Sequence, residues 1–227
     1  MKRLKLIPAM LSLILLAGCR QSVESVDICI YGGTSAGVIA AYTAAMDGKK
    51  VILVEPGRHV GGMTSGGLGY TDIGNKFVVT GLARDFYRRV GAHYGKFEQW
   101  IFEPSVAEKI FRQYIECAGV EVLYSHRLCD VKKDGCRITE IVVENSDSPS
   151  TITNRRIEAK MFIDCSYEGD LLARAGAAYT VGREDNSVYE ETYNGVHVMR
   201  GHQFWDPIDP YVVPGDSASG LIWGVSG

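Results

Sequence analysis

A glycine-rich turn between an apolar run and a small-residue segment is the part of this sequence best suited to chemistry. Residues 26–31 form the apolar run, Gly32 follows it, and Gly37 lies at the start of an alanine-rich segment. A helix N-terminus that is entered through glycines offers backbone N–H donors and a positive potential to a phosphate. A second apolar run, 51–54, ends in Glu55, a carboxylate suited to accepting hydrogen bonds from ribose hydroxyls. The combination predicts a dinucleotide site that would repel a 2′-phosphate.

The glycine motif departs from the G-x-G-x-x-G fingerprint at its middle glycine, where this chain has Thr34. We expect Gly32 to allow the sharp turn and Gly37 to allow close contact between helix and strand. A phosphate must approach past the β-branched Thr34, whose hydroxyl is an alternative hydrogen-bond donor to it. The same pattern also fits an ordinary tight turn in an α/β protein, and Glu55 favours the dinucleotide interpretation over that one.

These residues are positioned by a predicted β-α-β unit. Residues 26–31 are expected to form the first strand, 36–47 a helix that Gly48 terminates, and 51–54 the second strand. Two strands joined by a helix are parallel, with a right-handed crossover. Residues 57–75 are too rich in glycine for a regular helix or a central strand, and we interpret them as a loop near the ligand.

The remaining pattern predicts more helices and strands. We expect helices over 80–93 and 103–117, ended by Gly119, and then a strand over 120–124. From residue 128 on, apolar and polar residues alternate with the period of two that is typical of antiparallel strands. We predict a three-stranded meander over 128–132, 138–144 and 151–157. A strand over 160–164 would then return to the parallel sheet. The fold class is therefore α/β, a Rossmann-type parallel sheet with a three-stranded antiparallel β-meander as a crossover.

The first 18 residues are typical of a targeting segment. They begin with basic residues, continue with an apolar core over 11–16, and end in Leu-Ala-Gly directly before Cys19. This ending resembles the lipobox of bacterial lipoproteins, whose cysteine is lipid-modified after cleavage. The apolar core is well short of the ~20 residues that a membrane span needs. We therefore expect a lipoprotein signal peptide over 1–18, lipidation of Cys19 and a polar tether over 19–25.

Composition and residue spacing exclude several classes of partner. The 227 residues carry a net charge of −3 and are 46% hydrophobic, which fits one soluble domain or a domain and a half without a nucleic-acid footprint. The cysteines after Cys19 form no C-x-x-C pair and have no ligand spacing for zinc or an iron–sulfur cluster. His197 and His202 lack a carboxylate or cysteine that would complete a metal site. We therefore expect neither nucleic acid nor metal.

Three longer motifs are spread along the chain. They are Tyr31-Gly-Gly-Thr-Ser-Ala-Gly37, Glu55-Pro-Gly-Arg58-His-Val-Gly-Gly-Met63 and Phe162-Ile-Asp-Cys-Ser-Tyr-Glu-Gly-Asp170. Together they resemble the FAD-dependent oxidoreductase family of secreted and lipid-anchored bacterial flavoproteins. The resemblance implies an FAD-binding Rossmann domain over 26–175 and the incomplete beginning of a substrate domain over 176–227. The family's C-terminal flavin-binding segment has no counterpart before Gly227, which favours a truncated chain.

The resemblance also implies how FAD would be bound. The diphosphate would lie on the first glycine motif and the adenosine ribose on the carboxylate that follows the second strand. Adenine would contact the backbone near the start of the meander, and the second glycine signature would line the flavin side. The chain would return beneath the cofactor at 164–170. The implied cofactor-binding residues are Gly32, Gly33, Thr34, Ser35, Ala36, Gly37, Glu55, Arg58, Gly61, Gly62, Met63, Leu128, Asp164 and Ser166.

Two classes of function stay open. The first is a lipid-anchored flavoenzyme of the bacterial cell envelope, on its periplasmic or outer-membrane side, that transfers hydride between a small organic substrate and FAD. The second is a non-catalytic accessory or binding lipoprotein that keeps the Rossmann scaffold. The motifs leave the catalytic residue and the oligomeric state undecided. Candidates for proton transfer by residue type alone are His59, His93, His126, His197 and His202, of which His202 has the aromatic and amide neighbours that suit a substrate pocket.

Overall fold

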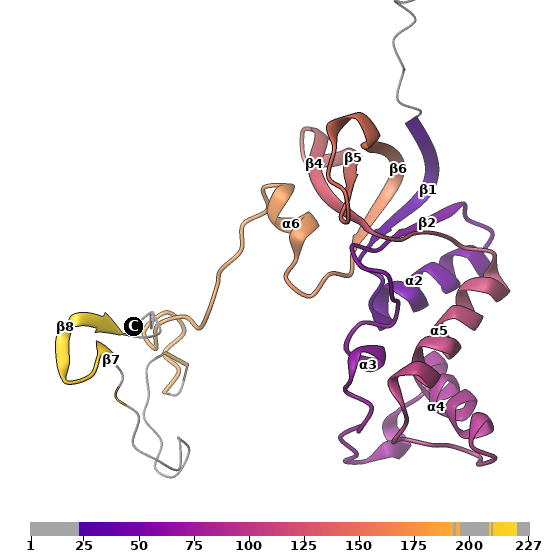
Figure 1. Ribbon diagram of the computed structural model, residues 1–227, viewed down its shortest axis with the longest axis horizontal. Coiled ribbons are helices and arrows are strands. Elements are labelled where there is room, and N and C mark those ends of the chain that lie inside the picture. The colour runs from indigo at the N-terminus through magenta and orange to yellow at the C-terminus, as the bar shows by residue number, and fades with distance from the viewer. Residues whose placement is uncertain (1–22, 193, 196–208, 210, 222–227) are drawn as a thin grey trace, which may run out of the picture. The chain divides into compact units, whose positions relative to one another are not determined.

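The computed structural model describes residues 23–192, 194–195, 209 and 211–221 (Figure 1). The chain divides into two compact units between Ala177 and Ala178. Cys19, His197 and His202 lie outside the described residues. Within the described ranges, no helix is both long enough and apolar enough to cross a membrane. The assignment of 26–175 to cofactor binding and of 176–227 to a substrate domain stays a prediction.

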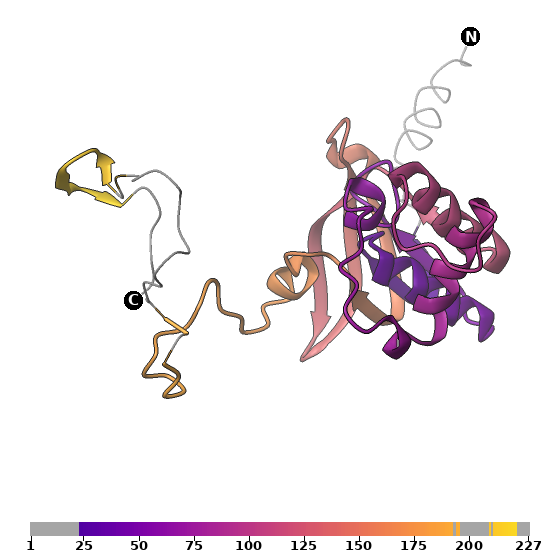
Figure 2. The same ribbon diagram turned by 90° about the horizontal axis from the view of Figure 1, so that it is seen from below.

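The first unit is built on one six-stranded sheet, and its longer helices cover one face of that sheet (Figure 2). The strands are arranged in the order β3-β2-β1-β6-β5-β4. The first four are parallel to one another, and β6, β5 and β4 form the antiparallel meander, so the predicted fold class is confirmed. The elements are β1 (Val23–Tyr31), α2 (Ser35–Met46), β2 (Val51–Val54), α3 (Met63–Gly66), η1 (Lys76–Val78), α4 (Gly81–His93), α5 (Pro104–Ala118), β3 (Glu121–Leu123), β4 (His126–Asp134), β5 (Arg137–Asn145), η2 (Thr151–Thr153), β6 (Arg155–Asp164) and α6 (Asp170–Arg174).

Local signals fix the ends of the helices. Thr34 caps α2, and its side chain accepts a hydrogen bond from the Gly37 amide. Pro104 occupies the first turn of α5, and Gly119 ends that helix in the left-handed conformation, as its sequence predicts. Within the predicted loop over 57–75, residues 63–66 form one helical turn.

One strand takes the place of two predicted ones. The separate strands expected over 151–157 and 160–164 are wrong, because β6 runs without a break from Arg155 to Asp164. No turn residue interrupts the sequence between 157 and 160, so the strand continues. One of its edges pairs antiparallel with β5 and the other pairs parallel with β1, which makes β6 a member of both parts of the sheet. Residues 151–153 form a 3-10 turn before it.

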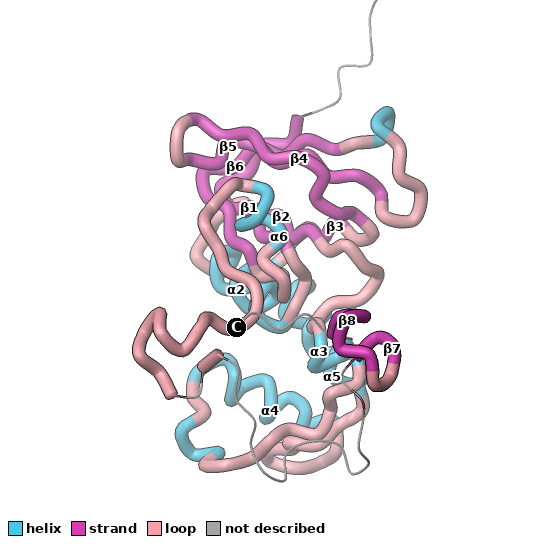
Figure 3. Tube along the Cα trace, turned by 90° about the vertical axis from the view of Figure 1, so that its left-hand side faces the viewer, coloured by secondary structure: helices cyan, strands magenta, loops and turns pink. Residues whose placement is uncertain are grey.

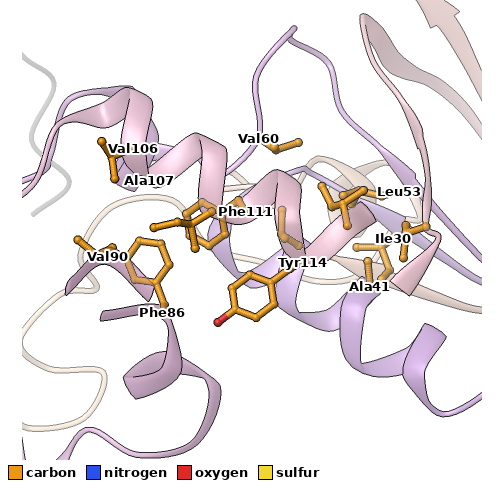
Figure 4. Close-up of a cluster of buried hydrophobic side chains, with 14 of the residues drawn as sticks. Ile30, Ala41, Leu53, Val60, Phe86, Val90, Val106, Ala107, Phe111 and Tyr114 are labelled. Carbon is orange, nitrogen blue, oxygen red and sulfur yellow. The ribbon is translucent and has the colours of Figure 1, made fainter. Parts of the chain in front are cut away.

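Two apolar cores cover opposite faces of the sheet. On the helical face, Phe86 of α4 stacks on Phe111 of α5 with ring centroids 4.8 Å apart, and Tyr114 is fully buried (Figure 4). On the other face, the meander packs against the alternate residues of β1 and β2, including Ile52. Strands that are covered on both faces are apolar throughout, which is why β2 consists only of buried residues.

A buried carboxylate joins the strands of the meander. Glu140 of β5 is only 3% exposed. It accepts hydrogen bonds from the Arg156 guanidinium at 2.6 and 2.9 Å, and the Lys132 ammonium lies 2.8 Å from it. The hydrogen bond from Arg156, helped by Lys132, holds the pKa of the Glu140 carboxyl below its usual value despite the opposing effect of burial.

This carboxylate makes the stability of the fold depend on pH. Because the pKa of Glu140 is lower in the folded chain, its ionised form stabilises the fold above the unfolded value of about 4.5, and this stabilisation is lost as the pH falls through the folded pKa. We expect Glu140→Gln to lower the unfolding free energy at pH 7 by about 1–3 kcal/mol and to flatten its fall on acidification. Urea unfolding between pH 7 and pH 3 measures both. An unchanged pH dependence would contradict the role of this pair.

The second unit is described from its own contacts. Its regular structure within the described residues is a hairpin of β7 (Tyr211–Val213) and β8 (Asp216–Leu221) (Figure 3). Asp209 accepts hydrogen bonds from the backbone amides of Tyr211 and Gly215, at 2.9 and 2.7 Å. The Asp209 carboxylate therefore fixes the turn of the hairpin.

Candidate functional site

A cavity of about 640 Å³ lies where β1, β2 and β6 end, beside the N-terminus of α2. Ligands of open parallel sheets bind at the carboxyl ends of the strands, and this volume is in the usual range for a small-molecule site. The cavity is lined by Gly32, Thr34, Glu55, Pro56, Gly57, Arg58, His59, Gly62, Ser65, Gly66, Ser105, Glu108, Ser166, Tyr167, Glu168 and Asp170.

The first glycine motif makes close backbone contacts that no side chain would permit. A Cβ atom on Gly32 would lie 2.6 Å from the Ser166 nitrogen, and Gly32 has a φ of +99°. A Cβ atom on Gly37 would lie 1.9 Å from the Gly32 carbonyl oxygen. The sharp turn at Gly32 and the close helix contact at Gly37 are therefore as predicted.

The Thr34 hydroxyl serves the fold. It donates a hydrogen bond to the Cys165 carbonyl at 2.9 Å and accepts one from the Gly37 amide at 3.3 Å, and the residue is buried. A hydroxyl has one proton to donate. The expectation that Thr34 donates to a phosphate is therefore corrected, because its proton is already used to link α2 to the end of β6.

The carboxylate of Glu55 is held by two backbone amides at the edge of the cavity. One oxygen accepts from the Gly33 amide at 2.7 Å and the other from the Gly57 amide at 2.6 Å. A carboxylate has about four acceptor positions, so further positions are open to hydroxyl donors. The Gly33 amide, which the resemblance assigned to the diphosphate, thus orients the acid that was assigned to the ribose.

The second glycine motif lies directly against the first. The Gly61 amide donates to the Gly33 carbonyl at 2.7 Å, and a Cβ atom on Gly62 would lie 3.2 Å from the Thr34 Cα. The Met63 amide donates to the Tyr167 hydroxyl at 2.7 Å. Two segments that are separate in the sequence therefore form one continuous wall.

Ser35 and Ala36, at the start of α2, border a second and smaller cavity of about 320 Å³. Its other lining residues are largely apolar and come from α2 to α5, among them Phe86, Tyr87 and Phe111. The N-terminal turn of α2 therefore lies between the two cavities.

The structure does not bring every residue implied by the resemblance into the larger cavity. Arg58 lines it, but its exposed guanidinium lies 3.1 Å from Asp147. Leu128 is buried, and its amide donates to the Tyr31 hydroxyl at 3.2 Å. Asp164 does not line the cavity, but its carboxylate accepts hydrogen bonds from the amide and the hydroxyl of Ser166, a residue that does.

Helix α5 contributes a charged cluster that the motifs did not reveal. The His59 Nδ1 lies 2.9 Å from the Glu108 carboxylate, which also accepts from Arg112 at 2.6 Å. Burial raises the pKa of the Glu108 carboxyl, but the hydrogen bonds from His59 and Arg112 lower it by more, so its net pKa is below the usual value. The i, i+4 spacing of Glu108 and Arg112 was the one signal in the sequence, and it is common on helices.

Of the candidate histidines, His59 lines the cavity. His126 is hydrogen-bonded to a main-chain carbonyl at 2.7 Å, and His93 lies in the last turn of α4. The described ranges hold no group of three or more His, Cys, Asp or Glu side chains that could bind a metal ion.

Comparisons with known proteins give a family and a fold. The sequence profile of a family described as FAD dependent oxidoreductase matches residues 27–217. Two curated thiamine thiazole synthases, from Pyrococcus horikoshii and Pyrococcus abyssi, are each 28% identical over 155 residues, which is 65% of this chain and 60% of the relative. The chain therefore spans about three fifths of the length of these relatives.

Solved structures with a similar fold include two flavoproteins. The flavin-dependent brominase Bmp2 superposes with a TM-score of 0.52 at 17% identity, over 70% of this chain and 42% of that protein. A flavoprotein/dehydrogenase from Cytophaga hutchinsonii superposes with a TM-score of 0.52 at 21% identity, over 71% of this chain and 44% of that protein. At these identities the likeness supports the fold alone.

Proposed function

Because the chain belongs to the FAD-dependent oxidoreductase family, we propose that it is a flavoenzyme of the bacterial cell envelope that transfers hydride between a small organic substrate and FAD. When bound, the flavin supplies the electron chemistry, and the protein supplies binding, orientation and exclusion of water. The observation that best supports the proposal is the Glu55 carboxylate, oriented by two amides on the wall of the larger cavity.

The donors and acceptors of the cavity fit the adenosine diphosphate half of FAD. Glu55 would hold the ribose hydroxyls, and the positive end of α2, which begins next to Thr34, would face the diphosphate. The carboxylates of Glu168 and Asp170 also line the cavity. A diphosphate bound here would therefore be attracted by the α2 N-terminus and repelled by these two acids.

Cofactor loading of the full chain tests this proposal. We expect the purified 227-residue chain, mixed with FAD and then freed of unbound FAD, to keep flavin absorbance, and we expect ADP to compete. A folded chain that binds neither FAD nor ADP would contradict the proposal. Bound flavin that no small organic substrate reduces under anaerobic conditions would instead favour the non-catalytic binding protein.

The proposed location rests on the sequence around Cys19. The segment 1–18 has the basic start, apolar core and small-residue end of a bacterial lipoprotein signal. A lipid chain adds about 0.8 kcal/mol of membrane affinity per buried CH₂ group. The mature chain would therefore associate with a membrane through lipid at Cys19.

Replacing this cysteine should abolish lipid attachment. We expect the wild-type chain to sediment with the membrane fraction of a bacterial host and Cys19→Ser to be largely soluble after removal of its signal or to persist as an unprocessed precursor. Cys136→Ser, which changes an exposed cysteine of the β4–β5 hairpin, is the matched control. Processing and membrane retention of Cys19→Ser at wild-type levels would refute lipid attachment at this site.

A further inference from the structure

Tyr167 projects from a loop that is firmly held. The loop follows β6, and the Asp164 carboxylate at its start accepts from the Ser166 amide at 3.0 Å, from the Ser166 hydroxyl at 2.6 Å and from the Leu172 amide at 2.9 Å. Tyr167 itself is 54% exposed and lines the larger cavity. Because Tyr167 is half exposed, its ring contributes little to the apolar core. Its defined contact is the one made by its hydroxyl group.

That hydroxyl contacts the second glycine motif. It accepts a hydrogen bond from the Met63 amide at 2.7 Å. The approach is possible because residue 62 is glycine, since a Cβ atom there would lie 2.1 Å from the hydroxyl oxygen and 3.0 Å from Cζ of Tyr167. Gly62 also has φ +58° and ψ −137°, a conformation that other residues rarely adopt. The absence of a side chain at 62 therefore serves both the backbone conformation and the tyrosine contact.

We infer that Tyr167 is a positioning residue, which fixes the second glycine motif and so sets the separation of two walls of the cavity. The inference rests on the proposed function. Gly62 packs beside Thr34, whereas Glu55 is bonded to Gly33 and Gly57 on the ribose side. The affinity for FAD, which extends beyond adenosine diphosphate, would depend on the position of residues 61–63. The affinity for ADP would depend on that position less.

Amide exchange in the nucleotide-free full chain tests the contact itself. Tyr167→Phe removes one hydroxyl and keeps the ring, so we expect the Met63 amide to exchange about fivefold faster, the effect of losing one hydrogen bond. Tyr70→Phe, which removes a hydroxyl from an exposed tyrosine outside the cavity, is the control and should leave this rate unchanged. An unchanged Met63 rate in Tyr167→Phe would overturn the inference.

Binding of FAD and of ADP tests the consequence. We expect Tyr167→Phe to raise the Kd for FAD about fivefold and the Kd for ADP less than twofold. Gly62→Ala, which keeps the hydroxyl but blocks its approach, should have the same selective effect. Equal losses for both ligands, or a loss in Tyr167→Phe without one in Gly62→Ala, would overturn the positioning role. A wild-type chain that binds neither ligand would overturn the proposed function, and this inference with it.

Discussion

Replacing Glu55 by glutamine is expected to weaken the binding of FAD and of ADP about 100-fold. Both oxygens of the carboxylate accept backbone amides, from Gly33 and from Gly57. A glutamine side chain has the same shape, but its NH₂ group is a donor and would face the backbone N–H of Gly33 or Gly57. The unsatisfied amide costs the fold about 1–3 kcal/mol with or without ligand, whereas a hydrogen bond between a ribose hydroxyl and a charged acceptor contributes about 1.5–3 kcal/mol to binding. A loss of about 2.7 kcal/mol, within that range, corresponds to the 100-fold change.

Fluorescence titration with FAD and calorimetry with ADP measure this loss. Glu168→Gln is the matched control, because it removes a carboxylate that lines the same cavity and should leave binding unchanged or slightly tighter. Glu55→Asp keeps the charge but shortens the side chain, and it should fall between wild type and Glu55→Gln. Near-wild-type affinity in a folded Glu55→Gln chain would mean that the carboxylate does not contact the ligand.

The sequence was a good guide to the elements that bring Glu55 to the cavity, because their signals are local. An apolar run, glycines, an alanine-rich segment and a second apolar run predict β1, α2 and β2 with no information from the rest of the chain. The division of β6 into two strands failed for the same reason. The alternation of apolar and polar residues in a strand cannot show that β6 pairs with β1 along one edge and with β5 along the other.

The contents of the site were harder to predict, because they depend on contacts between distant residues. The sequence pattern indicated no partner for the Thr34 hydroxyl, but in the fold this hydroxyl donates a hydrogen bond to the Cys165 carbonyl. Leu128 was expected to present its backbone to a ligand, and its amide instead meets the Tyr31 hydroxyl. The pattern around Tyr167 indicated that the chain returns to the cavity, but no spacing rule predicts its contact with residues 62 and 63.

Gly37→Ala is expected to lower the unfolding free energy by about 3 kcal/mol. In an ordinary helical position this change stabilises a protein by about 0.4–1 kcal/mol, because alanine is the better helix former. At Gly37 the new Cβ atom would lie 1.9 Å from the Gly32 carbonyl oxygen and 3.3 Å from the Cys165 Cβ. The backbone of the turn and the end of β6 would both have to move, and overpacking of this kind typically costs about 1–3 kcal/mol.

Denaturant unfolding of the full chain measures the difference, and Gly74→Ala provides the comparison. No heavy atom lies within 4 Å of a Cβ atom built on Gly74, whose φ is outside the left-handed region. The control should therefore remain within about 0.5 kcal/mol of wild type. The two variants add the same methyl group, and helix propensity favours alanine at 37, so a lower stability of Gly37→Ala than of the control reports the contact between α2 and the glycine turn. A Gly37→Ala chain as stable as the control would mean that α2 starts farther from Gly32, and the proposed diphosphate position at its N-terminus would lose its support.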